Sequence, residues 1–303
     1  MMISVIIPTR DRSDSLKNTI LSLKNQVISE ELGLDYEIIV VDNNSTDGTK
    51  ELVKDMGIQM NGRLKYIFES DKGASCARNK GIESAEGEII SFIDDDCTAV
   101  KNWLNEIALT FKNYNADAVL GKISLVLPAQ RPEWIPEWFL EKRLAKVDYG
   151  IATRRIDDKD LVAANISFKS EIFKKFGGFP SGIEPCEDTM YSRIITRRGA
   201  VKFYCPGAEV FHWIPSERLT GKYFSRQAHR WGFVKYSLAQ DNKTGIELLP
   251  WLFKELIKDI LGLILNYLKG KKTEHFLALC NIYDKMGIAK YLITRQFNLL
   301  KPE

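Results

Sequence analysis

Residues 88–96 read Glu-Ile-Ile-Ser-Phe-Ile-Asp-Asp-Asp, a short apolar run that ends in three consecutive carboxylates. A run this apolar is typical of a strand buried on both faces of a parallel sheet. Three runs upstream have the same character, at residues 4–8, 36–41 and 64–68. Open parallel sheets bind ligands at the carboxyl ends of their strands, so the aspartates mark the edge where we expect a functional site.

Segments with helical spacing of apolar residues alternate with these strands. Helices are expected at residues 14–26, 49–56, 74–84 and 187–197, and further strands at 117–125, 161–168, 201–204 and 209–213. This alternation predicts an α/β protein with a Rossmann-like, mostly parallel sheet flanked by helices. From residue 220 onwards the pattern predicts helices to the end of the chain, interrupted near 245–250 and at Gly270.

The composition excludes several classes of protein. The 303 residues carry 43 basic against 40 acidic side chains, a balance that argues against general nucleic-acid binding. The five cysteines form no Cys-x-x-Cys pair and there are three histidines, so we expect a reducing compartment and no structural zinc site. The N-terminus lacks a signal-peptide pattern and no stretch has 18 uninterrupted apolar residues, which predicts a cytoplasmic protein.

The three aspartates at 94–96 carry the strongest chemical signal. Adjacent carboxylates repel one another, and a divalent cation would relieve that repulsion. Oxygen ligands favour Mg²⁺ or Mn²⁺, and such an ion could hold a diphosphate and stabilise its charge as it leaves. The alternative is a solvated acidic turn, which the position directly after a strand disfavours.

Four other groups are ambiguous when each is taken alone. Residues 42–45 (Asp-Asn-Asn-Ser) could bind a base and a ribose, but the same residue types dominate ordinary turns. Arg78, near a helix start rich in small residues, could reach a phosphate or be a surface arginine. Glu187 and Asp188 could supply a general base or simply favour the first turn of a helix. His212 could be a metal ligand or a packed core residue.

Together these motifs resemble the family 2 glycosyltransferases of the GT-A type. The matching segments are Val5-Ile6-Ile7-Pro8-Thr9-Arg10, Ile39-Val40-Val41-Asp42-Asn43-Asn44-Ser45-Thr46-Asp47, Ala77-Arg78-Asn79, Phe92-Ile93-Asp94-Asp95-Asp96, Gly177-Gly178-Phe179, Glu187-Asp188 and His212. Their order and spacing match the family from the N-terminus to about residue 215. The resemblance implies a GT-A catalytic domain at 1–218, with a nucleotide-binding half (1–125) and an acceptor half (126–218), and a C-terminal helical region at 219–303.

The resemblance also implies roles for the matched residues. On the nucleotide side it implies Pro8, Thr9, Arg10, Asp42, Asn44, Arg78, Asp94 and Asp95, with Asp42 at the base and Asp94 at the ribose. Asp96 would hold the metal and the diphosphate, with His212 as a further metal ligand. Asp188 would be the catalytic base, with Glu187 beside it.

Members of this family use a nucleotide diphosphate-sugar as donor and invert the anomeric centre by direct displacement. The resemblance therefore implies a hexosyltransferase assisted by Mg²⁺ or Mn²⁺, with a UDP-sugar as the commonest donor in the family. The acceptor would be a saccharide or a lipid-linked molecule, and the pathway the assembly of a cell-envelope polysaccharide or glycolipid.

The middle and C-terminal parts of the chain hold weaker candidates for the acceptor or phosphate side. These candidates are Trp134, Trp138, Arg226, Arg230 and Trp231. The two nearer tryptophans are four residues apart and could share a helix face that stacks on a sugar, or could anchor packing. The others lie around residues 227–231, which fit the Gln-x-x-Arg-Trp signature of processive, membrane-embedded members; the alternative is an ordinary charged helix face.

The last sixty residues are basic and contain an aromatic-aliphatic helix pattern. From residue 243 to the end there are ten Lys or Arg against six Asp or Glu. Such a helix could lie on the inner face of the plasma membrane. Alternatively, its apolar face packs on the catalytic domain or forms a dimer.

Two other functions stay open. Residues 94–98 also fit the Asp-x-Asp-x-Thr signature of haloacid dehalogenase-like phosphatases, with Asp94 as nucleophile and Asp96 as acid and base. That family places the signature on its first core strand, whereas here it follows the fourth. A non-catalytic sugar-nucleotide binding module is the second alternative, and the joint presence of Asp96, Asp188 and His212 argues against it.

Overall fold

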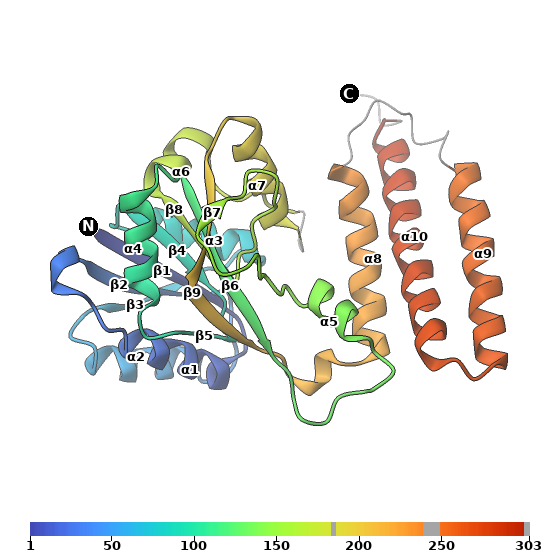
Figure 1. Cartoon of the computed structure of the whole chain (residues 1–303), viewed down its shortest axis with the longest axis horizontal. Coiled ribbons are helices and arrows are strands. Elements are labelled where there is room, and N and C mark those ends of the chain that lie inside the picture. The colour runs from blue at the N-terminus through green and yellow to red at the C-terminus, as the bar shows by residue number, and fades with distance from the viewer. Residues whose placement is uncertain (183–185, 239–248, 300–303) are drawn as a thin grey trace. The chain divides into compact units, whose positions relative to one another are not determined.

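The computed structural model describes residues 1–182, 186–238 and 249–299 (Figure 1). The chain divides into two compact units. The first unit combines residues 1–126 with 144–214, and the second combines 127–143 with 215–303. Residues 127–143, which the sequence places in the acceptor half, thus group with the C-terminal helices.

The first unit is built on one sheet. Its strands are β1 (Met2–Thr9), β2 (Asp35–Asp42), β3 (Leu64–Phe68), β4 (Ile89–Ile93), β5 (Cys97–Ala99), β6 (Ala118–Val126), β7 (Arg154–Arg155), β8 (Asn165–Lys169) and β9 (Lys202–Trp213). Its helices are α1 (Ser13–Lys24), α2 (Thr49–Ile58), α3 (Ala74–Ser84), α4 (Trp103–Asn113), α6 (Ser170–Phe176) and α7 (Glu187–Arg197), with a short 3-10 helix η1 (Glu30–Leu32).

The strand order is β3-β2-β1-β4-β8-β6-β9-β5, with β7 paired to β9. The first four strands in this order are parallel, as the sequence predicts. Beyond β4 the sheet is mixed, because β8 runs antiparallel to both β4 and β6, while β6 and β9 are parallel. The predicted α/β class is confirmed, and the strand that carries the three aspartates lies where the two halves of the sheet meet.

Two strands differ from the sequence prediction. The expected pair at 201–204 and 209–213 is the single strand β9, whose register against β6 shifts between Gly121 and Ile123. The shift coincides with Pro206 and Gly207, because proline cannot donate a ladder hydrogen bond. The three-residue strand β5 has no counterpart in the sequence prediction, because it follows directly on the acidic turn.

Close helix packing explains one glycine in the core. Helix α3 packs against β1 and β2, and a Cβ on Gly81 would lie 2.5 Å from Cγ2 of Ile6. The side chains of β1 and β2 are buried over almost their full length, which is the pattern of a sheet covered on both faces.

The second unit consists of helices. They are α5 (Glu137–Arg143), the 3-10 helix η2 (Ser216–Arg218), α8 (Gly221–Leu238), α9 (Leu249–Leu268) and α10 (Lys272–Leu299). Helix α10 lies between α8 and α9 and packs against both (Figure 1). The predicted helix break at Gly270 is confirmed. The other predicted break, at residues 245–250, lies mostly outside the described residues. None of the described helices is long and apolar enough to cross a membrane.

The α8–α10 contact depends on two glycines. A Cβ on Gly232 would lie 1.9 Å from the backbone oxygen of Asp284, and one on Gly287 would lie 2.0 Å from that of His229. The helix backbones therefore approach each other more closely than any other residue type would allow.

Candidate active site

The carboxyl end of β4 brings the acidic turn beside His212. After Asp94 the chain turns, with the backbone N–H of Cys97 donating to the oxygen of Asp94 at 3.0 Å. Strand β5 then pairs antiparallel with β9, so that Cys97 stands opposite His212. The backbone N–H of Trp213 also donates to the oxygen of Asp96 at 2.9 Å. Residues more than a hundred positions apart thus meet at one point of the sheet.

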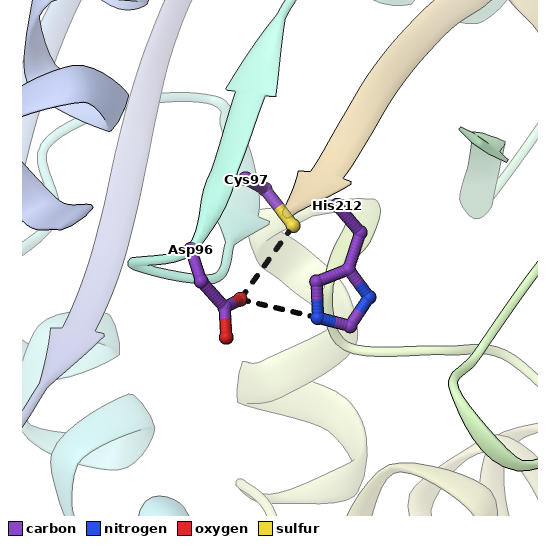
Figure 2. A group of neighbouring side chains, drawn as sticks. All are labelled: Asp96, Cys97 and His212. Carbon is purple, nitrogen blue, oxygen red and sulfur yellow. Dashed lines mark hydrogen bonds and ion pairs between the residues drawn. The ribbon is translucent and has the colours of Figure 1, made fainter. Parts of the chain in front are cut away.

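Asp96, Cys97 and His212 form a buried cluster of potential metal ligands (Figure 2). Each offers one ligand atom, and these atoms lie within 4.8 Å of one another. Oδ1 of Asp96 is 3.3 Å from Nε2 of His212 and 3.9 Å from Sγ of Cys97. A carboxylate and an imidazole make a ligand set for a divalent cation, and the nitrogen suits Mn²⁺ better than Mg²⁺.

The orientation of His212 supports this interpretation. Its Nδ1 lies 3.2 Å from the backbone oxygen of Leu144, and a carbonyl oxygen can only accept, so Nδ1 carries a proton. In the neutral ring Nε2 then presents a lone pair toward the Asp96 carboxylate. Two lone pairs at 3.3 Å repel unless a proton or a cation lies between them. A backbone carbonyl that fixes the tautomer is the usual support for a histidine that binds metal.

Asp95, the middle residue of the acidic triplet, is buried inside the protein. Its two carboxylate oxygens accept from Thr9 Oγ1 at 2.8 Å and from an Arg12 nitrogen at 2.9 Å. Burial raises the pKa of Asp95 to about 6, with Asp96 adding to the rise, while Arg12 and Thr9 act in the opposite direction. The same Arg12 nitrogen lies 3.1 Å from Asp96 and therefore links the two carboxylates.

Asp42 lies at the carboxyl end of β2, on the same edge of the sheet. Its carboxylate is buried and accepts from the backbone N–H of Ser45 and from the hydroxyl of Tyr66, both at 2.8 Å. Asn44, the next-but-one residue, has a φ of 67°, which is the left-handed conformation that asparagine tolerates in turns. The turn therefore holds Asp42 in one orientation.

Arg78 connects this edge with the first turn of α7. Its side chain is buried and donates to Glu187 Oε1 at 2.5 Å and to Asp94 Oδ1 at 3.4 Å. Nε of Arg78 and Oε2 of Glu187 are buried without a hydrogen-bond partner in the described part of the chain. Buried polar atoms in this condition are uncommon, and a water molecule or a ligand can supply the missing partner.

Asp188 lies next to this pair with its carboxylate on backbone donors. Oδ2 accepts from the N–H of Ala163 at 3.0 Å, and Oδ1 accepts from the N–H of Thr189 at 2.6 Å. Burial raises the pKa of Asp188 to about 6, and the neighbouring Glu187 adds to the rise, while Arg78 and the two backbone donors oppose it. A carboxylate with a pKa in this range is well suited to accept a proton near neutral pH.

The motifs at residues 77–79 and 177–179, which lie far apart in the sequence, are hydrogen-bonded to each other. Asn79 Oδ1 accepts from the backbone N–H of Phe179, and its Nδ2 donates to the Phe179 oxygen, both at 2.8 Å. A Cβ on Gly178 would lie 2.3 Å from Asn79 Oδ1, so this position has room only for glycine. The contact ties α3, which carries Arg78, to the segment that leads into α7.

The structure gathers most of the expected residues in the first unit. Pro8 and Thr9 end β1, and Arg10 is exposed next to Asp11, with which it forms an ion pair. The five weaker candidates, Trp134, Trp138, Arg226, Arg230 and Trp231, all belong to the second unit.

Within the second unit, the two tryptophans do not share a helix. Trp134 precedes α5, packs edge to face on Phe276 with ring centroids 5.0 Å apart, and accepts a hydrogen bond from Thr273. Trp138 lies on α5 and is 57% exposed. Arg226 and Arg230 are exposed on α8, one turn apart.

Sequence reasoning missed three residues of this edge. Arg12 lies just beyond the expected Pro8–Arg10 motif, and its charge was the available signal. Tyr66, on β3, reaches Asp42 from the neighbouring strand, and Cys97 follows the acidic triplet directly. The sequence has no signal for Tyr66, the central residue of β3, and marks Cys97 only by its position after the acidic triplet.

Comparisons with known proteins show the family and the fold of the chain. A family model described as Glycosyl transferase family 2 matches residues 4–177. The chain is similar to Glycosyltransferase AglE of Haloferax volcanii, at 24% identity over 65% of this chain and 62% of that protein. It is also similar to Glucosyl-dolichyl phosphate glucuronosyltransferase of the same organism, at 28% identity over 70% of this chain and 69% of that protein. The chain thus spans about two-thirds of the length of these relatives.

A solved structure shares the fold. The Mannosyltransferase PcManGT from Pyrobaculum calidifontis, in complex with GDP-Man and Mn²⁺, superposes with a TM-score of 0.58 at 18% identity, covering 99% of this chain and 76% of that one. At 18% identity, this similarity is evidence for a shared fold alone.

Proposed function

Since the chain belongs to glycosyl transferase family 2 and has the GT-A fold, we propose that it transfers a sugar from a nucleoside diphosphate donor to an acceptor hydroxyl with inversion. The observation that carries the proposal is the convergence of Asp96 and His212 at the carboxyl edge of the sheet, with Nε2 of His212 3.3 Å from the carboxylate. A cation at this point would lie at the carboxyl ends of the strands, where open α/β sheets bind ligands.

Asp96 and His212 would hold a divalent cation, Mn²⁺ in preference to Mg²⁺ because of the imidazole ligand. When bound, the ion would neutralise charge on the diphosphate as it leaves. We assign Asp42 to the base and the partly exposed Asp94 to the ribose. Asp95 would keep Arg12 in position, since it is buried and accepts a hydrogen bond from this arginine.

Asp188 would act as the general base. The acceptor oxygen attacks the anomeric carbon and gives its proton to Asp188. The new carbon–oxygen bond forms as the bond to the diphosphate breaks, and the electron pair leaves with the nucleoside diphosphate. Arg78 and Glu187 would orient the sugar, since each has a buried polar atom that a sugar hydroxyl could satisfy.

The acceptor class is proposed from a relative. One similar protein is named for transfer to glucosyl-dolichyl phosphate, a lipid-linked saccharide. We therefore propose a saccharide or lipid-linked acceptor. A UDP-sugar is the first donor to test, with GDP-mannose second because the structural neighbour binds it.

The test is release of nucleoside diphosphate from a panel of UDP- and GDP-sugars in the presence of Mn²⁺ and a lipid extract. We expect one donor to be consumed, and both a chelator and Asp188→Asn to abolish consumption. Asp55→Asn, an exposed aspartate on α2, is the matched control and should retain activity. Phosphate release from an aryl phosphate, lost in Asp94→Asn and without donor consumption, would contradict the proposal in favour of a phosphatase.

A further inference from the structure

Helix α9 buries very little of its apolar surface. Among its twenty residues Leu252 alone has a buried side chain. Ten large apolar side chains on the helix are 41–75% exposed: Leu249, Trp251, Phe253, Ile257, Ile260, Leu261, Ile264, Leu265, Tyr267 and Leu268. Contiguous apolar surface on this scale is rare on monomeric proteins and marks an interaction site.

The exposed residues form a stripe along one side of the helix. Phe253, Ile257, Leu261, Ile264 and Leu268 follow one another at spacings of three and four, which places them on a common face, and Ile260 lies on the same face, three residues after Ile257. The opposite side faces α10, where Leu252 packs near Ile288 and Leu292, and Asp259 pairs with Lys285. The stripe therefore points away from the neighbouring helix.

Basic side chains border this stripe. Lys254 and Lys258 are exposed one turn apart along one edge, and Lys269, Lys271 and Lys272 are exposed at its C-terminal end. The acids between residues 249 and 272 are Glu255, which is half-buried, and Asp259, which is paired within the unit. The border of the stripe is therefore positively charged.

We infer that this face of α9 lies on the surface of an anionic lipid bilayer. The apolar side chains would enter the boundary between headgroups and acyl chains, and the lysines would meet lipid phosphates. Trp251 and Tyr267, exposed near the two ends of the helix, are of the kind that favours the membrane interface. A second copy of the chain fits less well, because two such faces would bring their lysine borders together.

Flotation of the full-length protein with vesicles tests this inference without any assay of sugar transfer. We expect binding to vesicles that contain phosphatidylglycerol, and weaker binding to phosphatidylcholine alone or at high salt. Phe253→Gln with Leu261→Gln should weaken binding at least about tenfold, because both side chains would leave the bilayer. Lys254→Gln with Lys258→Gln should weaken it roughly tenfold on anionic vesicles only.

Matched controls lie on α2. Lys50→Gln with Lys54→Gln removes two exposed lysines at the same spacing, and Ile58→Gln removes an apolar side chain that is 82% exposed. Both should leave binding unchanged. A protein that stays unbound on phosphatidylglycerol vesicles at low salt overturns the inference. The inference is also overturned if light scattering detects a dimer, and Phe253→Gln with Leu261→Gln dissociates this dimer without changing vesicle binding.

Discussion

The candidate site holds two sets of aspartates, one at the end of β4 and one at the start of α7. They have the same side-chain chemistry but opposite surroundings. Asp94–Asp96, at the end of β4, face charged or ligand-type side chains, namely Arg12, Arg78 and His212. Asp188, at the start of α7, faces backbone N–H groups and lies beside another acid. The first arrangement suits the proposed role of Asp96 as a metal ligand, and the second gives Asp188 a raised affinity for a proton.

The comparison shows that the hydrogen-bonding and ion-pairing neighbours of an aspartate determine the role it is suited to. Asp95 shows the point within the first set, because it is buried and bonded to Thr9 and Arg12, whereas Asp96 lies beside His212. Arg78 contacts Asp94 in the first set and Glu187, the neighbour of Asp188. The proposed metal-binding and proton-accepting groups therefore share the buried guanidinium of Arg78.

The largest effect is expected for Asp188→Asn. Loss of a general base lowers turnover by about 10²–10⁴-fold, and donor binding should be retained because the first set is untouched. Steady-state kinetics and calorimetric titration with the nucleoside diphosphate measure the two quantities. A variant that loses donor binding but keeps its turnover once saturated would break the proposed division of roles.

His212→Ala is expected to raise the Mn²⁺ concentration needed for half-maximal activity by at least about tenfold, because a metal ligand is lost. His275→Ala is the matched control, because its Nδ1 also lies close to a backbone oxygen, that of Leu263 at 3.1 Å. Equal Mn²⁺ dependence in the two variants would remove His212 from the metal site.

The pH profile sharpens the comparison further. Since the pKa of Asp188 is raised to about 6, the side chain is protonated below that value and cannot accept a proton. Turnover should therefore be constant above pH 6 and fall about tenfold per unit below it. A profile that stays flat well below this range would contradict the assignment of the base.

The same shift has a consequence for stability. The folded protein binds this proton more tightly than the unfolded chain, in which the carboxyl has its ordinary pKa of 3.8. The stabilising contribution is therefore complete below pH 3.8 and is lost as the pH rises through 6. The melting temperature of Asp188→Asn, measured relative to that of the wild type, should therefore rise between pH 3.8 and pH 6. Thermal unfolding at several pH values measures this difference.

The last prediction concerns the stability of the scaffold that places His212. Asn165 is buried, donates to the backbone oxygens of Lys122 and Ala208, and accepts from the Trp103 indole. Asn165→Ala should lower the free energy of unfolding by about 2–4 kcal/mol, because buried polar groups lose their partner. Chemical denaturation measures this loss, and an unchanged midpoint would show that the β9 bulge does not depend on Asn165.

Local sequence patterns were sufficient for the parallel strands and their polar ends. The runs at β1, β2 and β4 are strongly apolar and end in residues typical of turns, so both the sheet and the acidic edge could be predicted. The pairing of Cys97 with His212 could not, because it depends on a three-residue strand and on a bulge at Pro206 and Gly207.

Long-range contacts explain the remaining gaps. Arg12 is part of the site because α1 begins just after it and Asp95 lies within reach, neither of which local spacing reveals. The contact of Asn79 with Phe179 joins residues one hundred positions apart. Of the two alternatives for Trp134 and Trp138, the shared helix face does not form, because Trp134 precedes α5 and packs on Phe276.

The most direct test of the central claim is a thermal-shift screen of UDP, GDP, dTDP and CDP, each with and without Mn²⁺. A ligand that binds the folded state raises its melting temperature. The account predicts a rise with one nucleotide that requires Mn²⁺ and disappears in Asp96→Ala. The absence of any rise in a folded wild-type sample, or a rise that Asp96→Ala leaves unchanged, would contradict it.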